Sequence, residues 1–83
     1  MSWNYRILKH KNSRTNESYY AIHEVHYNKD GVPRTWSKSR NLFEQEELDD
    51  LVWVHEKIKD ALEKPVLEWN GKQLLEIDEK IKG

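Results

Sequence analysis

The sequence predicts an α+β fold in which a three-stranded antiparallel β-meander packs on one long α-helix, in the order β-β-β-α. Two observations carry this prediction: an Asn-Lys-Asp-Gly turn between two aromatic runs within residues 19–36, and an apolar stripe at helical spacing within residues 45–64. With 83 residues the chain is expected to form a single domain, 1–83, with a βββα core over 1–64 and a C-terminal extension over 65–83.

Three strands are predicted from alternating side chains and from turn residues. The run from Trp3 to Lys9 places aromatic and apolar side chains at every second position, which is typical of a strand. A polar loop at 11–18 separates it from strands predicted at Tyr19 to Tyr27 and Val32 to Lys38. Pro33 has no N–H to donate, so the third strand is expected at an edge of the sheet.

The turn between the second and third strands predicts their register. The Asn28 side chain can accept a hydrogen bond from the backbone two residues on, and Gly31 can adopt the positive φ of a type I turn with a G1 bulge. Such a loop closes on Asn28 and Val32. It places Tyr27 opposite Pro33, His26 opposite Arg34, Val25 opposite Thr35, and Glu24 opposite Trp36.

The helix is predicted over Gln45 to Lys64. Acidic residues fill its first turns, where the helix dipole favours negative charge, and Pro65 ends it. The face expected to pack on the sheet has apolar spacing of 3-4-3-4: Leu48, Leu51, His55, Ile58 and Leu62. Trp53 falls on the opposite side of the helix, so we expect it to pack beneath the C-terminal segment or to lie in an interface.

The C-terminal extension has two interpretations. Asn70-Gly71 between apolar runs at 66–69 and 74–77 is a strong type I′ hairpin signal. Residues 72–82 also have helical propensity, with apolar positions at 74, 77 and 81. A hairpin is preferred, and a short helix remains open.

Composition and charge narrow the functional classes. The chain has no cysteine, which excludes disulfides and thiolate metal sites, and no apolar run approaches the ~20 residues of a membrane span, so a cytoplasmic protein without membrane contact is expected. Residues 1–41 hold eight basic against three acidic residues, a net charge of +5, whereas residues 42–83 hold six against twelve, a net charge of −6. The two halves are therefore expected to attract each other or a charged partner.

No catalytic, metal or cofactor site is predicted, and the chain is not expected to be an enzyme. The four histidines, His10, His23, His26 and His55, lack the spacing of a metal motif. His23 and His26 point to opposite faces of their strand, and His55 is expected to be a hydrogen-bonded core residue within the helix stripe.

A binding surface is predicted instead. One helix covers only one face of a small sheet, and aromatic and cationic side chains remain to form a candidate interaction surface: Trp3, Tyr5, Arg34, Trp36, Lys38 and Trp53. The expected function is a non-enzymatic protein-binding or regulatory module whose partner is another protein or a second copy of the chain. The alternative is a single-stranded nucleic-acid-binding domain, because cations alternate with aromatic residues along the predicted sheet.

Five blocks of the sequence occur in the order of a known bacterial family. They are Trp3-Asn4-Tyr5-Arg6, residues 22–27 (IHEVHY), Asp30-Gly31, Trp36-Ser37 and residues 61–67 (ALEKPVL). Over residues 3–68 the chain resembles small bacterial proteins of uncharacterised function that run WNYRV, IHEVYYDEDG and ALxKPVL. His26 replaces their usual Tyr. The β-β-β-α order is also similar to HicB-type antitoxin domains, and that resemblance implies an inhibitor of a small toxin as a minor alternative.

Overall fold

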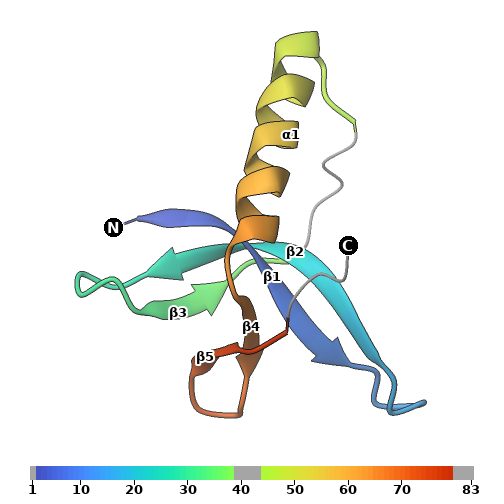
Figure 1. Cartoon of the computed structure of the whole chain (residues 1–83), viewed down its shortest axis with the longest axis vertical. Helices are drawn as coiled ribbons and strands as arrows, with labels where there is room; N and C mark the ends of the chain where they lie inside the picture. The colour runs from blue at the N-terminus through green and yellow to red at the C-terminus, as the bar shows by residue number, and fades with distance from the viewer. Residues whose placement is uncertain (1, 39–43, 80–83) are drawn as a thin grey trace.

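The computed structural model describes residues 2–38 and 44–79 and folds them into a five-stranded mixed sheet with one helix (Figure 1). The elements are β1 Trp3–Lys11, β2 Ser18–Tyr27, β3 Pro33–Trp36, α1 Leu48–Glu63, β4 Val66–Trp69 and β5 Leu74–Ile77. The strand order is β3-β2-β1-β4-β5. The α+β class predicted from the sequence is confirmed, and the three-stranded meander is wrong.

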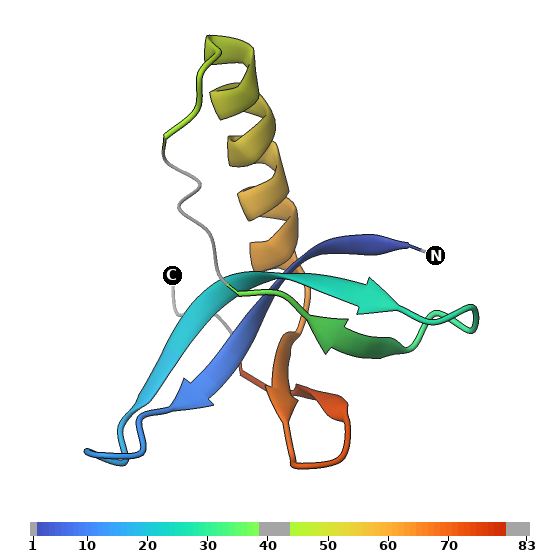
Figure 2. The same cartoon turned by 180° about the vertical axis from the view of Figure 1, so that it is seen from behind.

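The correction arises from the pairing of β4 with β1. These two strands run parallel, with Leu8 opposite Leu67 and Lys9 opposite Glu68. Parallel neighbours need a crossover connection, and here the chain between β1 and β4 includes β2, β3 and the helix. The segment after residue 64 is thus part of the same sheet rather than an added element, as both views of the ribbon show (Figure 2).

The turn between β2 and β3 forms as predicted. The Asn28 side chain accepts hydrogen bonds from the backbone N–H of Asp30 at 2.9 Å and of Val32 at 3.0 Å, and Gly31 has a φ of 77°. The loop closes through the Asn28 N–H, which donates to the Val32 carbonyl at 2.9 Å.

The predicted register holds only next to this turn. Tyr27 lies opposite Pro33, but an irregularity between His26 and Tyr27 then shifts the pairing by one residue, so that Val25 lies opposite Trp36. The predicted pairs further from the turn, including Glu24 with Trp36, are therefore wrong. Because a shift of one residue reverses the face of every side chain, Trp36 shares the face of the buried Val25.

The C-terminal hairpin is confirmed, but the predicted type I′ turn is wrong: four residues, 70–73, join the two strands, and Asn70 does not have the positive φ that a type I′ turn needs. β4 and β5 pair antiparallel from Val66 with Ile77 to Trp69 with Leu74. The Asn70 side chain accepts hydrogen bonds from the N–H groups of Lys72 and Gln73, both at 2.9 Å, and Gly71 has a φ of 97° that a residue with a side chain rarely adopts.

Alternation along the strands gives the sheet two packed faces. On the helix face, Tyr5 of β1 is buried with Val54 and Ala61 of α1. On the opposite face, the core consists of Leu8, Val25, Leu67 and Leu74. The sheet curls around this second core: the rings of Trp36 on β3 and Trp69 on β4 lie 5.4 Å apart although β2 and β1 separate their strands in the sheet.

The helix presents a different face to the sheet from the one predicted. Val54 and Ala61 are its buried residues, and Ile58 packs partly against them. Leu48 is 76% exposed, and Leu51, His55 and Leu62 are also exposed, so the predicted stripe and the predicted core histidine are wrong. The physical reason is the position of α1 on the sheet: its N-terminal end extends beyond the strands (Figure 1), and the side that meets Tyr5 of β1 is the one with Val54 and Ala61.

A buried arginine joins the sheet to the segment after the helix. Arg6 of β1 is 5% exposed and donates hydrogen bonds to the Tyr27 hydroxyl and to the Pro65 carbonyl, both at 2.8 Å. Its guanidinium also forms an ion pair with Glu76 of β5 at 3.1 Å. One side chain therefore links β2, β5 and the start of β4, which is how a charged group becomes tolerable inside so small a core.

Within the described residues, no helix is both long enough and apolar enough to cross a membrane.

Candidate functional site

The predicted interaction surface separates into two groups of residues. On the helix face, Tyr5 contacts both tryptophans edge to face, with its ring centroid 5.5 Å from Trp3 and 6.1 Å from Trp53. Tyr5 is buried, whereas Trp3 and Trp53 remain about half exposed. Trp53 thus packs on the first strand rather than beneath the C-terminal segment, and the Lys57 ammonium lies 5.5 Å from its ring.

The second group follows β3 and is divided between the surface and the inside of the curled sheet. Arg34 and Lys38 are exposed, but Trp36 is half-buried and packs against Trp69 inside the curl of the sheet. The shifted register of β3 is the reason. A base-stacking platform needs its aromatic face free, so this arrangement gives the nucleic-acid alternative less support than the sequence did.

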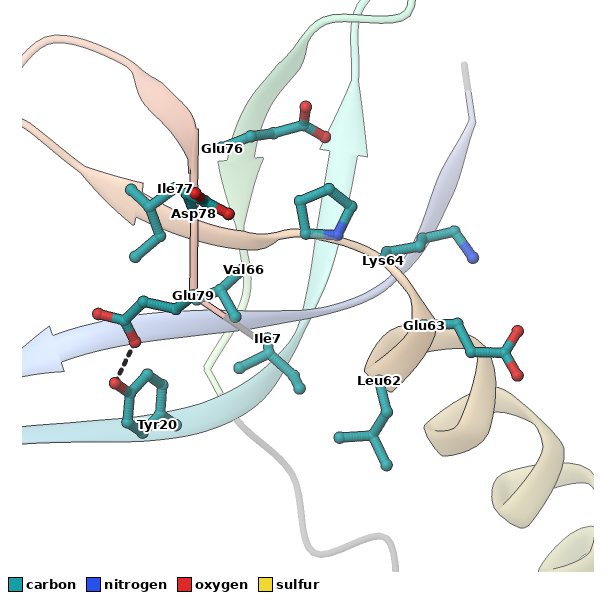
Figure 3. A pocket seen from close by; sticks show the side chains of 11 residues that line it. Ile7, Tyr20, Leu62, Glu63, Lys64, Val66, Glu76, Ile77, Asp78 and Glu79 are labelled. Atoms are coloured by element: carbon teal, nitrogen blue, oxygen red, sulfur yellow. Dashed lines mark hydrogen bonds between the residues drawn. The ribbon is translucent and has the colours of Figure 1, made fainter. Parts of the chain in front are cut away.

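A groove of about 830 Å³ lies on the helix face between the end of α1 and the β4–β5 hairpin (Figure 3). It is lined by Ile7, Tyr20, Leu62, Glu63, Lys64, Pro65, Val66, Glu76, Ile77, Asp78 and Glu79. Sequence reasoning missed this groove because its walls come from β1, β2, α1, β4 and β5. No local motif brings those segments together.

The apolar walls follow from strand alternation. Val66 lies opposite Ile77 in the hairpin, and Ile7 lies on the same face as Tyr5 two residues earlier in β1. Leu62 projects into the groove from the last turn of the helix, as Figure 3 shows. The helix covers Tyr5 and leaves Ile7 next to this open space, so the groove is the part of the helix face that α1 does not reach.

Carboxylates surround these apolar walls. Glu76 is held by Arg6, and Glu79 is held by the Lys9 ammonium and the Tyr20 hydroxyl. Glu63 and Asp78 have no ion-pair partner among residues 2–38 and 44–79. The groove is therefore apolar inside. Its rim holds these two carboxylates and one ammonium, that of Lys64, and so keeps a net negative charge.

The contacts of Glu79 shift the pKa values of all three groups. Hydrogen bonds from Lys9 and Tyr20 lower the pKa of the Glu79 carboxyl. The same carboxylate raises the pKa of the Lys9 ammonium and the pKa of the Tyr20 hydroxyl. Glu79 is thus ionised at neutral pH, and it ties the residues that follow β5 to β1 and β2.

Two histidines form a hydrogen-bonded pair on the opposite face. The Nε2 atoms of His10 and His23 lie 2.8 Å apart, and His23 Nδ1 lies 2.6 Å from the Ser37 carbonyl oxygen. Since a carbonyl only accepts, His23 carries its proton on Nδ1, and its Nε2 accepts from His10. No group of three potential metal ligands occurs in the described part of the chain.

This pair predicts a loss of stability in mild acid. Burial, followed by the charge of His23, lowers the pKa of His10 below its ordinary 6.5. Between that value and the lowered pKa, the unfolded chain binds more protons than the folded one, so stability decreases as pH falls. The melting temperature of the wild-type protein is expected to drop between about pH 7 and pH 5, and less so in His10→Asn. Equal drops in both proteins would contradict this.

No family model, no curated protein and no solved structure matches this chain.

Proposed function

We propose that this chain is a non-enzymatic protein-binding module that holds a segment of a partner protein in the groove on the helix face. The observation that carries the proposal is the groove itself, which has apolar walls from five elements and a volume of about 830 Å³. Concave, largely apolar surfaces with a few polar groups at their rim are typical binding sites.

The chemistry of the lining supports binding rather than catalysis. Neither serine, threonine, cysteine nor histidine lines the groove. The Tyr20 hydroxyl is engaged by Glu79, and Lys64 donates to the Asp60 carbonyl at 3.4 Å, away from the apolar walls. Because the contact with Glu79 raises the pKa of the Tyr20 hydroxyl, it disfavours the phenolate that a nucleophilic role would need.

The test compares two leucines of one helix. Leu62→Lys places a charge in the groove, and Leu48→Lys places the same charge on an exposed position outside it. The wild-type protein and both variants are immobilised and incubated with nuclease-treated and untreated bacterial lysate. We expect the wild type and Leu48→Lys to retain one or more lysate proteins that Leu62→Lys does not retain. Nuclease treatment is expected to leave this retention unchanged.

Two results would overturn the proposal. Identical retention by all three proteins would show that the groove does not bind. Retention that disappears after nuclease treatment would show that the chain binds nucleic acid instead of a partner protein.

A further inference from the structure

We infer that the segment held in the groove is basic as well as apolar, with lysine or arginine residues beside aliphatic ones. This inference rests on the proposed function and specifies its partner. The inference follows from a comparison of the carboxylates at the rim that have an ion-pair partner with those that have none.

Two of the four carboxylates at the rim are already neutralised within the chain. Glu76 pairs with Arg6, and Glu79 pairs with Lys9. Glu63 and Asp78 have no such partner in the described residues. A ligand that enters the groove therefore meets two carboxylates that form no ion pair within the described residues, and one ammonium, that of Lys64.

Glu63 and Asp78 could each form an ion pair with a cation of a bound segment. Glu63 is the last residue of α1, and Asp78 follows the end of β5. In Figure 3 they lie on different sides of the hollow, with Val66 and Ile7 between them, and Glu63 extends outwards on the same side as Lys64. A segment lying along the apolar walls would reach both, so a cation at each end and an aliphatic centre fit the groove.

The carboxylates at the rim also disfavour two other ligands, an acidic segment and a second copy of the chain. An acidic segment would be repelled by the carboxylates of Glu63 and Asp78. A second copy docking through the same groove in a two-fold arrangement would bring its own Glu63 and Asp78 towards these carboxylates. Self-association through the groove is thus opposed by like-charge repulsion.

The experiment selects peptides rather than assuming one. A library of displayed random peptides is selected on the wild-type protein, with Leu62→Lys as the subtractive control. The enriched peptides are then synthesised, and their affinities are measured by fluorescence anisotropy at low and at physiological salt. We expect the enriched sequences to combine aliphatic residues with an excess of lysine and arginine.

Matched variants test the role of the two carboxylates. Glu63→Gln with Asp78→Asn removes them, whereas Asp49→Asn with Glu56→Gln removes one aspartate and one glutamate from exposed helix positions outside the groove. The first pair of substitutions is expected to lower the affinity for the peptides by between about twofold and thirtyfold, the range for the loss of two solvent-exposed ion pairs. It should also reduce the dependence of that affinity on salt. The second pair should leave the affinity unchanged.

The outcomes separate the two proposals. Enriched peptides that are neutral or acidic, or that bind both variant pairs equally, would overturn the basic partner and leave a protein-binding groove in place. No enrichment over Leu62→Lys would overturn the groove as a protein-binding site.

Discussion

Replacing Leu67 with alanine is expected to lower the free energy of unfolding by about 2–5 kcal/mol. Leu67 is 0% exposed and lies opposite Leu8, which is 1% exposed, where β4 joins β1. The loss would combine the transfer free energy of the removed methyl groups with the cavity that they leave. Urea melts followed by circular dichroism measure it, and for so small a domain the change is a large part of the total stability.

Leu48→Ala is the control for this prediction. Leu48 begins the helix and is 76% exposed, so its replacement is expected to change stability by less than ~0.5 kcal/mol. Similar losses in both variants would mean that the 3-4-3-4 stripe of the helix is buried after all. The comparison therefore tests which face of α1 the sheet covers.

Replacing Arg6 with methionine is expected to cost about 3 kcal/mol. Methionine keeps much of the side-chain length but removes the donors to the Tyr27 hydroxyl and the Pro65 carbonyl, so two part-buried hydrogen bonds to a charged group are lost together. Thermal and urea unfolding of the variant measure the loss.

Glu76→Gln separates the contributions to the Arg6 network. The Glu76 side chain is 60% exposed, so loss of its charge is expected to cost less than ~1 kcal/mol. If Glu76→Gln proved as damaging as Arg6→Met, the ion pair rather than the carbonyl and hydroxyl contacts would be the main contribution of Arg6.

The features that could be predicted from the sequence are those whose cause is local. Asn28 and Asn70 each bond backbone groups two residues on, and Gly31 and Gly71 each take the positive φ of their turn. Such turns need no distant partner. Both hairpins were therefore predictable from a few residues each.

The sheet beyond the hairpins could not be predicted, because its causes are not local. Leu8 and Leu67 pair across most of the chain, and neither carries a signal for the other. The helix pattern was misleading for a related reason: spacing identifies an apolar stripe, but the position of α1 on the sheet decides that Val54 and Ala61 are buried instead.

The candidate site shows the same division. Residue types alone suggested a surface containing Trp3, Trp36 and Trp53, and the one-residue shift between β2 and β3 turned Trp36 inward. The groove beside Leu62 and Val66 needs the β1–β4 pairing, so it could not be found before that pairing was known.

The parallel pairing of β1 with β4 also sets the order in which this protein can fold. During synthesis, β1 and β2 can form a hairpin early, but Leu8 has no partner on its other side until Leu67 has left the ribosome. The core around Leu8 is complete only after Leu74 follows. The open edge of β1 is thus expected to be exposed to aggregation or chaperone binding until β4 and β5 have been synthesised.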